Sequence, residues 1–157
     1  MEIERKFRVV NNDWRAEVSA SEYCAQAYFP TDNPEIVVRV RILGDKGFLT
    51  IKGPQVGISR PEFEYPVPVA DAKAMMASLT TGNITKVRHY VPAGNGLVWE
   101  IDEFEGANAG LIIAEIELPS ESCEFQVPSW AGADESTNIR FTNSYLARFP
   151  WNPAIER

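Results

Sequence analysis

The sequence predicts a β-rich α+β fold, in which eight antiparallel strands close into a tunnel, or barrel, with a charged lumen and flanking helices. Three observations support this class. Glycine-containing turns divide the chain into short segments, charged and apolar residues alternate within those segments, and helical periodicity is confined to a few stretches.

Turn chemistry marks the ends of the expected strands. Breaks rich in glycine at 44–47, 53–57, 92–96 and 106–110 supply residues that adopt positive φ between strands. The intervals predict strands at 2–9, 22–29, 35–43, 47–53, 59–67, 85–91, 97–105 and 111–118. Helices are expected at 71–79 and near 135–148, with weaker signals at 12–18 and 121–125.

The chain is expected to form one domain, residues 1–157, because it shows no fixed-period repeat and no linker-like segment. A chain of this length buries roughly 68–70% of its unfolded surface, so its core needs no disulfide. Cys24 and Cys123 have no metal-site spacing and are expected to be reduced thiols in a cytoplasmic protein. No apolar run approaches the ~18 residues of a membrane helix, so no membrane association is expected.

Charge and histidine content exclude several classes of function. The net charge of -7 argues against a nucleic-acid partner, which usually requires a basic surface. The single histidine, His89, argues against a histidine-rich zinc site and against a Ser-His-Asp triad. His89 falls on the apolar side of its strand and is expected to be a packed or outward-facing residue. Any chemistry must therefore come from carboxylates, lysine and arginine.

Alternation sorts most strands into one charged and one apolar face, because successive strand residues point to opposite sides. In the first strand, for example, Glu2, Glu4, Lys6 and Arg8 share one face. Seven segments carry such a stripe, whereas the second strand does not follow the pattern clearly. The acidic members are Glu2, Glu4, Glu62, Glu64, Glu100, Asp102, Glu115 and Glu117, and the basic members are Lys6, Arg8, Arg39, Arg41, Lys52, Arg60, Lys86 and Arg88.

For any one strand, a polar face turned to water explains the stripe. Taken together, the stripes consist of closely spaced pairs of one sign, which repel each other unless a counter-ion lies between them. Carboxylate pairs favour a hard cation such as Mg²⁺ or Mn²⁺, and Arg and Lys pairs favour phosphate oxygens. A closed tunnel would place the cation at one wall and the phosphates at the other.

The residues that carry these stripes resemble a known family. The segment Met1-Glu2-Ile3-Glu4-Arg5-Lys6-Phe7 is similar to the N-terminal Glu-x-Glu-x-Lys signature of the CYTH superfamily, the triphosphate tunnel metalloenzymes. The resemblance continues in order through 38–41, 49–52, 59–64, 86–88, 99–102 and 114–117. It implies an eight-stranded antiparallel tunnel that binds a triphosphate together with a divalent metal.

The resemblance also implies roles for individual residues. Lys86 would help to activate the attacking water, with metal-activated water as the competing nucleophile. Glu62 and Glu64 would orient water, join the metal site or neutralise neighbouring arginines, and Glu100 would be a further supporting residue. The expected metal ligands are Glu2, Glu4, Asp102, Glu115 and Glu117, and the expected phosphate-binding residues are Lys6, Arg39, Arg41, Lys52, Arg60 and Arg88.

The chain departs from the family pattern near its C-terminus. Residues 139–146 resemble the family's closing helix, but this chain lacks the lysine that relatives often carry around Thr142 or Ser144. Arg140 is one candidate to replace that lysine, and a solvated helix residue is the other interpretation.

The leading functional hypothesis is metal-dependent hydrolysis of inorganic triphosphate to pyrophosphate and phosphate. One alternative is a class IV type adenylate cyclase or another organic triphosphatase, for which Phe48 and Tyr90 are the candidate aromatic contacts. Another is a non-catalytic module that binds polyphosphate or nucleotides. The expected partner is a small-molecule triphosphate, and a homodimer is the oligomeric state kept open.

Overall fold

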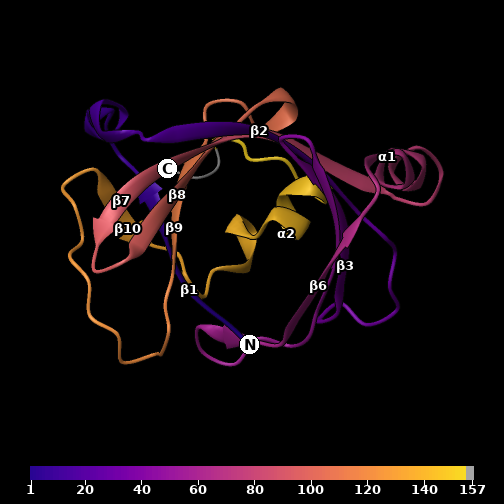
Figure 1. Cartoon of the computed structure of the whole chain (residues 1–157), viewed down its shortest axis with the longest axis horizontal. Coiled ribbons are helices and arrows are strands. Elements are labelled where there is room, and N and C mark those ends of the chain that lie inside the picture. The colour runs from indigo at the N-terminus through magenta and orange to yellow at the C-terminus, as the bar shows by residue number, and fades with distance from the viewer. Residues whose placement is uncertain (155–157) are drawn as a thin grey trace.

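A computed structural model describes residues 1–154, and its main element is an antiparallel sheet rolled into a barrel (Figure 1). Residues 155–157 of the predicted domain lie outside the described residues. The strands run in the order β10-β1-β9-β8-β7-β2-β3-β4-β6, and β5 pairs with β1. They are β1 (Glu2–Val9), β2 (Ala20–Tyr28), β3 (Val37–Leu43), β4 (Lys46–Lys52), β5 (Ser59–Arg60), β6 (Glu62–Val67), β7 (Gly82–Gly94), β8 (Leu97–Phe104), β9 (Ile112–Glu117) and β10 (Ala131–Asp134).

The barrel closes at Pro61. The expected strand at 59–67 is two strands, because proline has no N–H to donate to a ladder and interrupts pairing. Before Pro61, β5 pairs with β1 through Glu2 and Arg60, and after Pro61, β6 pairs with β4. The chain therefore joins the two edges of the sheet and nearly closes the tunnel, as the sequence predicted.

The predicted number of strands was too low. The continuous path contains nine strands rather than eight, with β5 in addition. The extra member is β10, which pairs with β1 through Phe7 and Asp134. Its sequence, Ala131-Gly132-Ala133-Asp134, lacks the β-branched and aromatic residues that usually indicate a strand.

The helices differ from the four that were expected, and three of the five that form in the described part of the chain are short 3₁₀ helices. The five are the 3₁₀ helices η1 (Asp13–Glu17), η2 (Gly106–Asn108) and η3 (Ile139–Phe141) and the α-helices α1 (Val69–Ser78) and α2 (Asn143–Arg148). The helix expected near 135–148 is broken at Thr142, whose extended backbone separates η3 from α2. Within residues 1–154, no helix combines the length and the apolar character needed to span a membrane.

The helix expected at 121–125 is absent, and this expectation was wrong. The segment instead lets Phe125 pack edge-on against Phe7 and Trp99 on the outside of the barrel, at ring-centroid distances of 6.3 and 5.7 Å. This tertiary packing overrides a short local periodicity.

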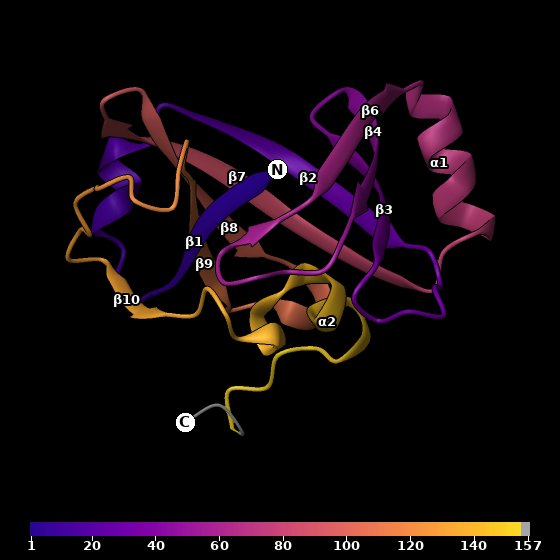
Figure 2. The same cartoon turned by 90° about the horizontal axis from the view of Figure 1, so that it is seen from below.

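Apolar residues on the outer faces of the strands form two core clusters. The larger cluster contains Phe7, Trp99 and Ile101 and is covered by Trp14 of η1 and by Trp130. The smaller contains Ala27 and Val40 and is covered by Ala72 of α1. Figure 2 shows α1 beside the barrel, whereas α2 lies at one end of it.

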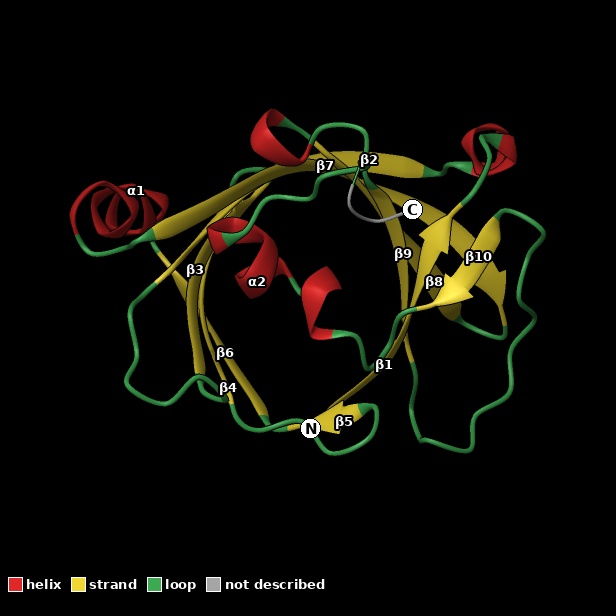
Figure 3. Ribbon diagram, turned by 180° about the vertical axis from the view of Figure 1, so that it is seen from behind, coloured by secondary structure: helices red, strands yellow, loops and turns green. Residues whose placement is uncertain are grey.

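A third cluster lies inside the barrel, at one end of it. There the lumen-facing positions change from charged to apolar, at Ile84, Phe104 and Ile113. Phe141 of η3 and Leu146 of α2 pack onto them, and both are nearly inaccessible to solvent. Figure 3 shows η3 and α2 lying within the ring of strands. We call η3 and α2 (139–148) the C-terminal plug, because they fill that end of the tunnel.

Candidate active site

The barrel encloses a cavity of about 240 Å³ between the C-terminal plug and the charged strand faces. Its wall carries six cationic side chains and seven carboxylates. The cationic residues are Lys6, Arg39, Arg41, Lys52, Arg60 and Arg88, and the acidic residues are Glu2, Glu4, Glu62, Glu64, Glu100, Glu115 and Glu117. All six predicted phosphate-binding residues thus line one cavity.

Two predicted site residues do not line the cavity. Lys86 and Asp102 point toward the lumen side of β7 and β8, but both side chains are fully buried. The Lys86 ammonium lies 2.6 Å from Asp102 Oδ2 and donates to Asn143 Oδ1 at 2.8 Å, so it also holds the C-terminal plug. Burial lowers the pKa of Lys86, although the Asp102 carboxylate opposes this shift.

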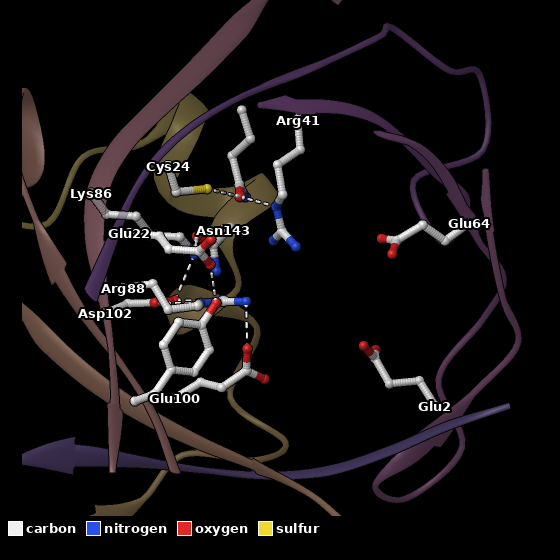
Figure 4. Close-up of polar contacts among 12 residues, drawn as sticks. Glu2, Glu22, Cys24, Arg41, Glu64, Lys86, Arg88, Glu100, Asp102 and Asn143 are labelled. Atoms are coloured by element: carbon white, nitrogen blue, oxygen red, sulfur yellow. Dashed lines mark hydrogen bonds and ion pairs between the residues drawn. The ribbon is translucent and has the colours of Figure 1, made fainter. Parts of the chain in front are cut away.

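Asp102 is also the partner of Arg88. The guanidinium of Arg88 grips this carboxylate with two bonds, Nε to Oδ1 at 2.8 Å and Nη2 to Oδ2 at 2.9 Å. Its Nη1 donates to Glu100 Oε2 at 2.8 Å. Burial by itself lowers the pKa of Arg88, but the two carboxylates outweigh it and raise that pKa well above its ordinary value. Figure 4 shows this group gathered on one side of the lumen.

Carboxylates concentrate where β1, β9 and β8 meet. Glu4 lies opposite Glu117, and Glu100 lies opposite Glu115, in neighbouring rows of the sheet. Burial and the charges of Glu115 and Glu2 raise the pKa of Glu4 well above its usual range. Burial also acts to raise the pKa of Glu115, but Lys6, Lys86 and Arg88 hold it low. In this conformation, protonation of Glu4 would relieve its repulsion from Glu115.

The facing wall is formed by β3 and β4 and is rich in arginine. Arg39 donates to Thr50 Oγ1 at 3.2 Å and to Glu64 Oε2 at 3.4 Å, while its buried Nε has no hydrogen-bond partner among residues 1–154. Arg41 makes one hydrogen bond, from Nε to Gln26 Oε1 at 2.9 Å. The acids and bases are therefore not strictly separated onto two walls as expected, because Glu64 lies between the arginines and the open lumen.

The remaining cations connect the walls and the plug. Lys52 lies 2.9 Å from Glu2 Oε1 and 3.4 Å from Glu62 Oε2. Arg60 Nε donates to the carbonyl of Gly53 at 2.9 Å. Lys6 Nζ donates to the carbonyl of Phe141 at 3.1 Å. Lys6 is thus in contact with the plug, as Lys86 is.

Comparison with known proteins agrees with this geometry. Residues 1–149 match the CYTH domain. The chain belongs to the CYTH domain family. It is 40% identical over 150 residues to a protein named inorganic triphosphatase from Acetivibrio thermocellus, covering 96% of this chain and 95% of that protein. It is 30% identical over 148 residues to an inorganic triphosphatase from Nitrosomonas europaea, covering 93% and 96% of the two chains.

The crystal structure of the inorganic triphosphatase NE1496 has the same fold. It superposes on this chain with a TM-score of 0.66 at 29% sequence identity, covering 94% of both chains. The antiparallel barrel of this CYTH domain is therefore shared with a solved relative. The predicted extent of the domain, 1–157, stays a prediction beyond the matched residues.

Sequence reasoning missed the lumen face of β2 in this CYTH domain. The register places Gln26 opposite Arg41 and Tyr28 opposite Arg39, so β2 contributes an inward row of residues. Parity alone could have found this row, but most of its members carry no charge and gave no stripe. The row consists of Glu22, Cys24, Gln26 and Tyr28.

The uncharged part of the cavity wall was also missed. Several hydroxyl and amide side chains near the plug line the cavity, and none belonged to the charged pattern: Tyr28, Gln55, Ser136, Thr142, Asn143 and Ser144. Arg140 is exposed and is not part of this lining.

The two aromatic candidates and the histidine lie elsewhere. Phe48 is opposite Arg41 but does not line this cavity, and the Tyr90 hydroxyl donates to Glu22 Oε2 at 2.6 Å. His89 lies against Trp14, with ring centroids 5.0 Å apart, and contacts Glu103 Oε1 at 3.0 Å. It is a packed histidine, as the apolar parity predicted.

The donor set of the cavity fits a hard divalent cation. Among residues 1–154, no three His, Cys, Asp or Glu side chains are close enough together to hold a metal ion in this conformation. Glu2, Glu4, Glu115 and Glu117 nevertheless line one cavity and supply only oxygen donors, which Mg²⁺ and Mn²⁺ prefer. A cation would offset the mutual repulsion of these carboxylates and would draw them together.

Proposed function

We propose that this CYTH protein hydrolyses inorganic triphosphate to pyrophosphate and phosphate with the help of a divalent metal. The observation that carries the proposal is the single cavity lined by six cationic side chains and seven carboxylates. The curated relatives named inorganic triphosphatase, at 40% and 30% identity over nearly the whole chain, support the choice of substrate.

The charge balance of the cavity supports the need for a metal. Carboxylates outnumber cationic side chains there, so a highly charged anion gains little from the wall by itself. A divalent cation held by these carboxylates would reverse that balance and would supply positive charge that stabilises the phosphoryl group during the reaction. We propose Glu2, Glu4, Glu115 and Glu117 as the residues that hold Mg²⁺ or Mn²⁺. Asp102 is less suited, because Arg88 and Lys86 occupy both of its oxygens.

The arginines would bind and orient the substrate. Phosphoryl transfer requires mainly in-line placement and charge stabilisation, and little covalent chemistry from the protein. Arg39 and Arg41 approach the lumen from β3, and Arg88 approaches it from β7. The C-terminal plug fills the far end of the tunnel and limits how deeply the substrate can enter.

The role of Lys86 in activating water stays a prediction, since its ammonium is held by Asp102 and Asn143 behind the cavity wall. Lys86→Arg tests it, because a guanidinium keeps an ion pair but does not act as a base in proteins. The prediction expects kcat to fall about 10²–10⁴-fold while the variant stays folded. An unchanged kcat in folded Lys86→Arg would assign water activation to another group.

The cytoplasmic location, the absence of nucleic-acid and membrane partners and the homodimer also remain predictions. The free thiols of Cys24 and Cys123 are consistent with a reducing compartment. The oligomeric state can be read by light scattering on the purified chain.

The decisive experiment measures phosphate release from inorganic triphosphate by the purified protein, with Mg²⁺, with Mn²⁺ and with EDTA. We expect metal-dependent release that EDTA abolishes. Matched reactions with ATP, assayed for phosphate and cyclic AMP, test the alternatives. Cyclic AMP would indicate the cyclase, ATP hydrolysis without triphosphate hydrolysis an organic triphosphatase, and metal-assisted binding without turnover the binding module.

Glu4→Gln tests the metal ligands. Burial and the charges of Glu115 and Glu2 raise the pKa of Glu4 and disfavour its charged form, so a neutral amide of the same shape removes that repulsion. We expect unchanged unfolding without metal and a higher Mg²⁺ concentration for half-maximal activity. Glu103→Gln, outside the cavity, is the matched control. Full activity of Glu4→Gln at limiting Mg²⁺ would exclude Glu4 as a ligand.

A further inference from the structure

Gln26 makes a polar contact that the charged stripes do not explain. It lies on β2 directly opposite Arg41 of β3, and its exposed fraction is 1%. Its Oε1 accepts from Arg41 Nε at 2.9 Å and from Cys24 Sγ at 3.4 Å. Its Nε2 donates to Tyr28 Oη at 2.6 Å. A buried amide with both ends engaged is held rigidly.

The chemistry of these partners fixes the orientation of the amide. A guanidinium can only donate, so the Gln26 oxygen must face Arg41 and the nitrogen must face Tyr28. The Tyr28 hydroxyl then accepts from Gln26, and its own proton is free to point elsewhere. Arg41 and Tyr28 both line the cavity, so one amide sets the direction of two cavity groups.

Arg41 differs from the other cavity arginines of β3 and β7 in the charge of its partner. Arg39 is paired with Glu64, and Arg88 is paired with Glu100 and Asp102. Within residues 1–154, Arg41 makes no ion pair. Figure 4 shows its guanidinium directed into the open lumen.

We propose that Gln26 is a positioning residue, which aims the Arg41 guanidinium at the bound triphosphate while leaving its positive charge uncompensated. This inference rests on the proposed function, because it assumes that a triphosphate occupies the cavity. A neutral acceptor at position 26 holds Nε and turns the two terminal nitrogens of Arg41 toward the lumen. A carboxylate there would hold Arg41 equally well but would cancel the charge that the phosphates need.

Two substitutions distinguish a role of Gln26 in positioning the charge of Arg41 from a role in packing alone. Gln26→Glu keeps the shape and the acceptor for Arg41, whereas Gln26→Met keeps the approximate volume and removes all three hydrogen bonds of the amide. A purely structural role predicts that Gln26→Met is the more damaged variant in every assay. The positioning role predicts the reverse order for substrate affinity, with Gln26→Glu the weaker binder although it folds at least as stably as Gln26→Met.

The experiment measures KM and kcat for inorganic triphosphate with saturating Mg²⁺, together with calorimetric binding of triphosphate and urea unfolding. We expect Gln26→Glu to raise KM at least about tenfold with kcat nearly unchanged, since an interaction with phosphate charge present throughout the reaction is uniform binding. Gln26→Met should raise KM by a smaller factor, and Glu103→Gln should match the wild type.

The outcomes distinguish this inference from the proposed function. An active wild type with an unchanged KM and affinity in Gln26→Glu would overturn the role of Gln26 alone. Binding of triphosphate by the wild type without hydrolysis, weakened in Gln26→Glu, would support Gln26 and reject hydrolysis. A wild type that neither binds nor hydrolyses triphosphate would overturn both.

Discussion

Two walls of the same tunnel hold their arginines in opposite ways. On the β7–β8 wall, Arg88 is enclosed by Asp102 and Glu100, with Lys86 behind them. On the β2–β3 wall, Arg41 is held by the neutral amide of Gln26. The exposed fractions of the two arginines are similar, at 6% and 9%. Two arginines that are similarly buried can therefore differ in how much of their charge is available to a ligand. Arg88 shares its charge with two carboxylates, whereas Arg41 makes no ion pair within residues 1–154 and offers its full charge to a ligand.

The largest expected effect is on stability at the β7–β8 wall. Arg88→Ala leaves the buried Asp102 with Lys86 as its remaining cationic partner and removes the partner of the half-buried Glu100. Breaking a buried charge pair in this way costs about 3–5 kcal/mol. We expect the urea midpoint to fall accordingly without a change in the slope of the transition. A midpoint within error of the wild type would mean that water enters this wall and solvates the carboxylates.

The second effect is on affinity at the β2–β3 wall. Arg41→Ala removes charge-assisted hydrogen bonds to phosphate, each contributing about 1.5–3 kcal/mol, so we expect KM to rise roughly 10- to 150-fold. Burial, Arg39 and Arg88 already lower the pKa of Arg41, so the metal-free fold should lose little or no stability. Steady-state kinetics and urea unfolding on one preparation check both statements. Strong destabilisation of Arg41→Ala with an unchanged KM would mean that Arg41 stabilises the fold and does not bind the substrate.

The smallest expected effect is on stability, at the outer face of β8, the strand that carries Asp102. Glu103 follows Asp102 but faces outward, where it pairs with Arg15 at 2.8 Å and contacts His89. Its side chain is 36% exposed, so Glu103→Gln should cost only about 0.2–1 kcal/mol.

This outer pair also has a defined pH dependence. Hydrogen bonds from Arg15 lower the pKa of Glu103, so its contribution is present above the unfolded pKa and is lost as pH falls through the folded value. Wild type and Glu103→Gln should therefore converge in thermal stability at acid pH. A difference that grows on acidification would contradict this assignment.

The charged faces of the strands could be predicted from the amino-acid sequence. The parity of Glu2, Glu4 and Lys6 follows from the geometry of a strand, and the same rule placed the six predicted phosphate-binding residues at one cavity. The family followed from the same ordered residues, and residues 1–149 match its domain.

The position of each charged residue along the tunnel axis is set by the tertiary structure. Lys86 and Arg88 share one face and are two positions apart, yet Arg88 lines the cavity and Lys86 does not. Parity assigns a residue to a face but carries no information on how far it lies from the end of the barrel. That depth depends on strand register, and on the C-terminal plug, whose Asn143 covers Lys86. The pairing of Gln26 with Arg41 has the same origin, since the register between β2 and β3 is set by contacts that no single segment contains.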